Sequence, residues 1–334
     1  MRPSKFRFLS STSAVSGASS QGSQPIHSSS SKLPMLSLAD NTRNNAVAGL
    51  GEFVGTFLFL FFSFAGTQIA NTPAPVPSDT PSLPNSSNLL FISLAFGASL
   101  MANVWAFYRI TGGLFNPSVT IALFLVGGLP ALRSAVVIAA QLLGGLAAAG
   151  VVSALFPGPM AVDTLLGGGA TVVQGLFIEV FLTAELVFVI IMVAVEKHKS
   201  TFLAPVAIGV AFFLAELTGV YYTGGSLNLA RSLGPAIVNR SFPGYFWIYV
   251  VGPGLGSLLA SGFYALLRHL RYEGCNPGQD WNDLEKMESQ KRDFALRSNA
   301  RDAAHHANGA TNGSVPDGAT NGNANGHGHG VLQV

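Results

Sequence analysis

Charged side chains are scarce in this sequence of 334 residues, of which only 10% are Asp, Glu, Lys or Arg. Soluble domains usually carry about 25%. Apolar residues make up 49% of the chain, and the mean hydropathy is +0.43. This composition excludes an ordinary soluble domain and predicts a membrane protein that crosses the bilayer several times.

Cysteine and clustered basic charge are also lacking. Cys275 is the only cysteine, which excludes an intramolecular disulfide framework and a cysteine-based metal site. The formal net charge is only +2, and the basic residues lie at span ends and in the tails, so we expect no nucleic-acid partner. The membrane region shows no nucleophile–base pair, phosphate loop or metal cluster. We therefore expect no enzymatic activity, no cofactor and no bound metal.

Apolar segments long enough to cross a bilayer, about 20 residues each, occur six times. They lie at 46–70, 88–110, 130–153, 173–195, 203–222 and 244–268. Two shorter segments, 116–127 and 228–238, are too short to span and are predicted to be re-entrant half-helices. The sequence thus predicts a channel domain at 46–270 between disordered tails at 1–45 and 271–334.

The distribution of Lys and Arg predicts that both termini are cytoplasmic. The loops 71–87 and 154–172 contain neither residue and would lie on the opposite side, whereas Arg240 is an exception. Asn85 begins a glycosylation sequon in the first of these loops. The loop at 196–202 is a candidate for gating. We expect a plasma-membrane location, with a vacuolar or other internal membrane as the alternative.

The second half of the membrane region repeats the first. Glu52 and Glu179 each begin a similar phrase in the first span of a half, and Thr-Gly-Gly, two residues and Asn recur at 111–116 and 223–228. Each repeat, 46–153 and 173–268, has three spans, so the second must be inverted, which places a functional site near the midplane.

The repeated loops suit a pore. Asn116 and Asn228 can cap the half-helices and offer an amide N–H to a passing molecule. The two positive helix ends, together with Arg231, would oppose cations, including protons. We expect Glu52 and Glu179 to be structural buried acids that accept hydrogen bonds from loop backbone. The alternative is a proton relay of a coupled transporter.

Several motifs in order carry a resemblance to a known family: AGLGEFVGTFLFLFF, SLAFG, TGGLFNPSVTIAL, YYTGGSLNLARSLGPAIV and WIYVVGP. On these motifs the sequence resembles the major intrinsic proteins, the aquaporins and aquaglyceroporins, over about 46–270. The resemblance implies an all-α membrane protein with six tilted transmembrane helices and two re-entrant half-helices. It also implies an hourglass pore in each subunit of a homotetramer.

The two pore motifs depart from the Asn-Pro-Ala that is usual in the family. The first reads Asn116-Pro117-Ser118 and the second Asn228-Leu229-Ala230. Leu229 restores a backbone N–H and removes the ring that presets the first helical turn. We expect a modest effect on rigidity and pore width, without loss of the fold.

The resemblance implies a selectivity filter at four positions, namely Phe96, Glu216, Gly225 and Arg231. Water-selective members usually have His where this chain has Glu216, and glycerol carriers usually have Gly. Glu216 either pairs with the Arg231 guanidinium in a bidentate fork, or turns away and bonds loop backbone.

A passive channel for water, with small neutral solutes also admitted and protons and ions excluded, is the predicted function. Ser232, Ala236 and Phe96 favour the water-selective branch over the glycerol carriers. The alternatives are a glycerol or polyol facilitator, and a non-conducting structural protein whose filter is closed by a Glu216–Arg231 bridge. The expected partners are the lipid bilayer and further copies of the chain.

Overall fold

The computed structural model describes residues 39–72, 85–276, 288 and 291–300, and within these ranges all regular structure is helical. Six helices are long and apolar enough to span a membrane. They are α1 (Asp40–Asn71), α2 (Ser86–Phe107), α4 (Ala131–Leu155), α5 (Val172–Ile190), α6 (Ala204–Thr223) and α8 (Ile248–His269). The short helices α3 (Pro117–Leu125) and α7 (Leu229–Val238) follow the two repeated loops. The predicted six spans and two half-helices are confirmed.

Shorter helical turns flank three of the spans. The π-helical turn η2 (Ile191–Val195) continues α5, the 3₁₀ turn η3 (Lys199–Leu203) precedes α6, and η4 (Tyr272–Gly274) follows α8.

The ends of the predicted channel domain differ from the structure. Helix α1 begins at Asp40, inside the predicted tail 1–45. The Asp40 carboxylate forms an ion pair with Arg43 at 2.7 Å, and its negative charge is favourable at the positive N-terminus of the helix. Residues 291–300 are helical, and Glu288 pairs with Arg292 at 3.3 Å, so the prediction of disorder across 271–334 is wrong there. The remaining tail residues, and the loop residues 73–84, lie outside the described part of the chain.

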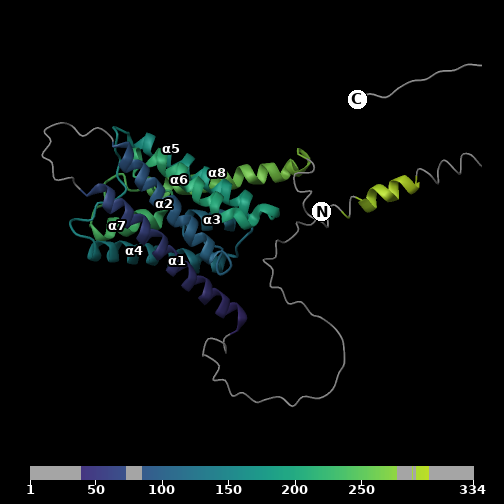
Figure 1. The fold of residues 1–334 in the computed structure, drawn as a ribbon, viewed down its shortest axis with the longest axis horizontal. Helices are drawn as coiled ribbons and strands as arrows, with labels where there is room; N and C mark the ends of the chain where they lie inside the picture. Colours follow the sequence, from purple (N-terminus) through teal and green to yellow (C-terminus); the bar gives the residue numbers. More distant parts are fainter. Residues whose placement is uncertain (1–38, 73–84, 277–287, 289–290, 301–334) are drawn as a thin grey trace, which may run out of the picture. The chain divides into compact units, whose positions relative to one another are not determined.

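The two repeats are packed into each other. Helix α1 packs on α4 and α5 on α8, while α2 packs on α6 across the repeats. Each half-helix contacts the last span of the other repeat, α3 on α8 and α7 on α4 (Figure 1). Helices α4 and α8, which pack on α1 and α5, therefore bring together the loops that precede α3 and α7.

Glycines set the closest of these approaches. A side chain at Gly97 would lie 2.9 Å from the carbonyl oxygen of Gly209, and one at Gly209 would lie equally close to that of Gly97. Helices α2 and α6 can touch only because both positions lack a side chain. The outer faces, in contrast, expose large apolar residues such as Phe62, Leu94 and Phe181, as expected of surfaces that meet lipid.

Candidate functional site

Two asparagines join the two half-helices at the centre of the fold. Asn116 is the N-cap of α3, and its Nδ2 donates to the carbonyl oxygen of Leu227 at 2.9 Å. Asn228 is the N-cap of α7, and its Nδ2 donates to the carbonyl oxygen of Phe115 at 2.9 Å. This reciprocal pair of bonds holds the positive N-termini of α3 and α7 against each other.

The asparagine oxygens are both occupied. Oδ1 of Asn116 accepts the Ser118 N–H at 2.8 Å. Oδ1 of Asn228 accepts the N–H groups of Ala230 at 2.8 Å and Arg231 at 3.4 Å. Each amide nitrogen has two N–H groups and uses one across the junction. The asparagine pair therefore turns its oxygens toward the backbone of the half-helices and leaves one N–H group of each amide for a molecule between the loops.

Two buried carboxylates support the loops from behind. Glu52 on α1 accepts the N–H groups of Leu114 at 3.1 Å and Phe115 at 2.8 Å. Glu179 on α5 likewise accepts those of Ser226 at 3.0 Å and Leu227 at 2.8 Å. These are the loop-backbone bonds expected of both acids, which supply partners to N–H groups that would otherwise be unsatisfied at membrane depth.

These carboxylates also hold a strained backbone. Phe115 has a φ of 50° and Leu227 a φ of 51°, a left-handed conformation that costs a bulky residue roughly 1–3 kcal/mol. In each loop it turns the carbonyl group of the residue toward the opposite asparagine. Equal strain at both positions follows from the repeat.

The departures at the pore motifs leave the half-helices intact. Pro117 and Leu229 occupy the first position of α3 and α7 respectively. At the second position of α3, the Ser118 carbonyl oxygen accepts a bond from Ser257 Oγ at 2.8 Å. The Ala230 carbonyl oxygen instead lies against Gly145. The fold therefore tolerates Leu229, as expected.

Arg231 is buried, with 1% of its surface exposed, and is held by backbone carbonyl oxygens. Its Nε donates to Gly225 at 2.9 Å, its Nη1 to Val162 at 2.6 Å and its Nη2 to Gly224 at 3.1 Å. The guanidinium carbon lies 5.0 Å from the Phe96 ring centroid, within cation–π range. The structure thus brings Phe96, Gly225 and Arg231 together.

Glu216 makes neither of its two predicted interactions. It is fully buried on α6, and neither carboxyl oxygen has a hydrogen-bond partner among the described residues. Among the described residues, no hydrogen bond joins Glu216 to Arg231, whose guanidinium instead donates to three backbone carbonyl oxygens. The carboxyl group lies against Gly225, where an added methyl group would overlap Oε2. The predicted filter closure by a Glu216–Arg231 bridge is therefore wrong for this structure.

Two groups that contact the site residues were not predicted from the sequence. The Val162 carbonyl oxygen has no sequence signal, because every residue carries one. Gln141 on α4 donates to Glu52 Oε2 at 2.8 Å and to Thr120 Oγ1 at 2.9 Å. A lone amide in an otherwise apolar span was the available signal for Gln141.

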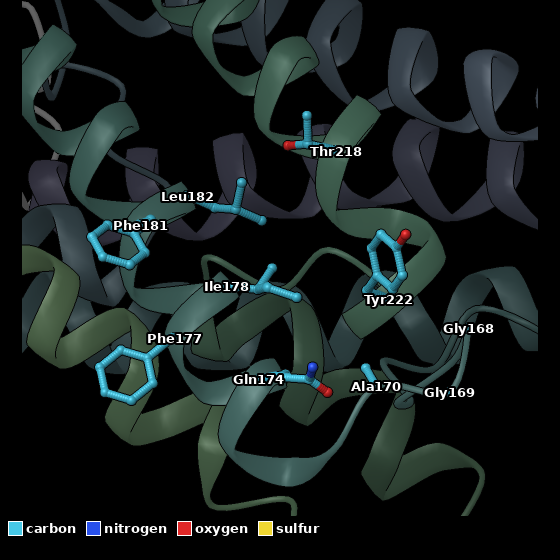
Figure 2. Close-up of a pocket in the computed structure, with 10 residues that line it drawn as sticks. All are labelled: Gly168, Gly169, Ala170, Gln174, Phe177, Ile178, Phe181, Leu182, Thr218 and Tyr222. Carbon is cyan, nitrogen blue, oxygen red and sulfur yellow. The ribbon is translucent and has the colours of Figure 1, made fainter.

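A wide groove lies along α5 and α6, away from the asparagine pair (Figure 2). Its volume is about 670 Å³, and the side chains of Phe177, Ile178, Phe181 and Leu182 line it together with the loop at 168–170. It contains none of the predicted site residues. Its apolar lining suits lipid or another protein surface better than a polar solute.

Comparison with known proteins agrees with this geometry. The family described as Major intrinsic protein matches residues 40–264. Aquaporin-7 of Botryotinia fuckeliana is 58% identical over 249 residues, which cover 73% of this chain and 54% of the relative. Probable aquaporin-5 of Gibberella zeae is 53% identical over 260 residues, covering 76% and 47%. The chain thus spans about half the length of these two relatives.

Probable aquaporin-3 of Gibberella zeae is 50% identical over 235 residues, which cover 70% of this chain and 82% of the relative. Among solved structures, the aquaglyceroporin from Plasmodium falciparum has a TM-score of 0.57 at 22% identity, covering 66% of this chain and 95% of that chain. At this identity the structural match shows the shared fold alone.

Proposed function

The chain belongs to the major intrinsic protein family, and from this premise we propose that it is a passive channel for water and small neutral solutes that excludes protons and ions. It is an integral membrane protein with several spans. The observation that carries the proposal is the junction of the two half-helices, with its asparagine pair.

The asparagine pair orients water. In this proposal a water molecule between Asn116 and Asn228 turns its oxygen toward both amide nitrogens, because the amide oxygens face the backbone N–H groups of their own half-helices. Its own hydrogens then point away from the junction, toward either mouth. A chain of waters in this arrangement cannot pass a proton through the centre. The positive ends of α3 and α7 and the charge of Arg231 also repel cations.

The four filter positions supply the second element of selectivity in this proposal. Arg231 retains two N–H groups beyond the three that bond to backbone. Glu216 offers carboxyl oxygens that no described residue uses. A water or other small hydroxylated molecule could receive a bond from Arg231 and donate one to Glu216, which would offset the loss of its hydration.

Assembly and location complete the proposal. The family resemblance implies a homotetramer with one pore per subunit, and the exposed apolar faces are available for contacts with other copies and with lipid. We place both termini in the cytoplasm of a cell whose plasma membrane holds the protein. Chemical crosslinking in native membranes, with bands at four times the subunit mass, would support the tetramer.

Stopped-flow light scattering on reconstituted vesicles tests the function. Vesicles that contain the protein should shrink in a sucrose gradient several-fold faster than empty vesicles, and should re-swell slowly in a glycerol gradient. Rapid re-swelling in glycerol would assign the protein to the polyol carriers. Rates equal to those of empty vesicles in both gradients would reject the channel.

A further inference from the structure

Three phenylalanine rings from three different helices meet inside the bundle. Phe59 on α1, Phe96 on α2 and Phe212 on α6 are all at most 1% exposed. The ring centroid of Phe212 lies 5.7 Å from that of Phe59 and 5.9 Å from that of Phe96, and the remaining distance is 6.4 Å. These three residues, the aromatic triad, form a closed set of ring contacts.

The aromatic triad lies between the two polar elements of the proposed pore. On one side, Phe59 and Phe212 line a cavity together with Asn116 and Asn228. On the other side, the Phe96 ring lies 5.0 Å from the guanidinium carbon of Arg231. A molecule that travels between the asparagine pair and the filter must therefore pass these rings.

Very little room is left beside the rings. The cavity that Phe59 and Phe212 share with the asparagines has about 10 Å³ open to the centre of a water molecule. About 10–15 Å³ is the least that holds one water. The helices that carry Phe96 and Phe212, α2 and α6, also approach closely at Gly97 and Gly209.

The internal repeat shows that the fold does not require aromatic rings here. Thr223 follows Thr111 by 112 residues, and Glu179 follows Glu52 by 127, so each member of the triad has an equivalent in the other repeat. The pairs are Phe59 with Leu186, Phe96 with Ile208 and Phe212 with Leu100. All three aliphatic equivalents line the same cavity. The proposed pore thus has aromatic rings at three positions whose equivalents in the other repeat are aliphatic.

We propose that the aromatic triad extends the constriction beyond the four filter positions, of which it shares only Phe96, and that Phe212 is the residue that sets the size limit for solutes. The inference rests on the proposed channel function and specifies its selectivity. Aromatic rings offer neither a hydrogen-bond donor in the ring plane nor an acceptor comparable to water, so a molecule passes the triad partly dehydrated. Water passes in single file, whereas a three-carbon polyol is excluded. Phe212 is assigned this role because it makes the two shortest ring contacts of the triad.

The substitution Phe212→Leu tests the proposal, because it copies the residue that the other repeat carries at the equivalent position. Phe59→Leu copies Leu186 in the same way and serves as a second variant if the first does not fold. Phe188→Leu is the matched control, since Phe188 pairs with Phe263 at 5.2 Å outside the triad. Each protein is reconstituted at equal density, after size-exclusion chromatography has shown it to be monodisperse, and is tested in sucrose and glycerol gradients.

We expect the Phe212→Leu channel to pass water several-fold faster than wild type and to gain glycerol permeability, while Phe188→Leu behaves as wild type. Wild-type water flow with unchanged rates in both triad variants would overturn the constriction and leave the channel function standing. Rapid glycerol flow through wild type would overturn the size limit. An inactive wild type with a conducting Phe212→Leu would reject the channel function and support the constriction. If wild type and triad variants are all inactive, both proposals fail.

Discussion

Removing the carboxylate of Glu179 should loosen the second pore loop more than any other single truncation on α5. Glu179→Ala would leave the N–H groups of Ser226 and Leu227 buried without partners. Each unsatisfied group costs about 1–3 kcal/mol, so the two together cost roughly 2–6 kcal/mol. In addition, the left-handed backbone of Leu227 would lose the contacts that hold it.

The assay is thermal unfolding in detergent, followed by fluorescence-detected size-exclusion chromatography. For a domain of about 200 residues, 1 kcal/mol corresponds to roughly 2–4 °C, so the apparent midpoint should fall on the order of 10 °C. Glu179→Gln should recover part of this loss, because its amide has one oxygen for two donors. Thr183→Val, one turn along the same helix, is the control, since the Thr183 hydroxyl has no hydrogen-bond partner in the described structure. If Glu179→Ala unfolds at the same temperature as Thr183→Val, water already bonds to the exposed loop N–H groups and the reasoning is refuted.

Three further predictions concern the filter and the helix crossing. Glu216→Val should fold normally and should lower water permeability in stopped-flow measurements by roughly two- to tenfold, the equivalent of one lost hydrogen bond; an unchanged rate would remove Glu216 from the filter. Arg231→Val should admit a proton current, detected by a pH-sensitive dye inside vesicles, and a proton-tight variant would show that the half-helix ends suffice. Gly97→Leu should yield no monodisperse protein, because it displaces α6. Gly262→Leu, at a position where an added Cβ meets no atom within 4 Å, should behave as wild type in the same chromatography.

The long helices could be predicted because bilayer thickness fixes their length. The predicted span 130–153 and the observed helix Ala131–Leu155 differ by two residues at most. The start of α1 was placed too late because the polar turn that begins at Asp40 extends the helix beyond the apolar run. Apolar length locates the membrane-embedded part of a helix and does not locate its end.

The pairing of Glu216 could not be predicted, for a different reason. Opposite charges at neighbouring filter positions favour a salt bridge, but the orientation of the guanidinium also depends on the other acceptors around it. Those acceptors are backbone carbonyls of Val162, Gly224 and Gly225, and a carbonyl has no sequence signature. The capping roles of the two asparagines were easier to predict, because a capping side chain and its helix are adjacent in the sequence.

The repeat separates what builds the pore from what makes it selective. Where the repeats agree, as in the two asparagines and the two carboxylates behind them, the same backbone bonds recur in both halves. Where the repeats differ, the first repeat shows which residue the fold accepts at the position equivalent to a proposed filter residue of the second. Counting back 112 residues, Val104 stands where Glu216 does and Val119 where Arg231 does. Since a buried acid and a buried base are costly and the same fold accepts valine at both positions, their presence in one repeat only supports the proposal that they act on the permeating molecule and not on stability.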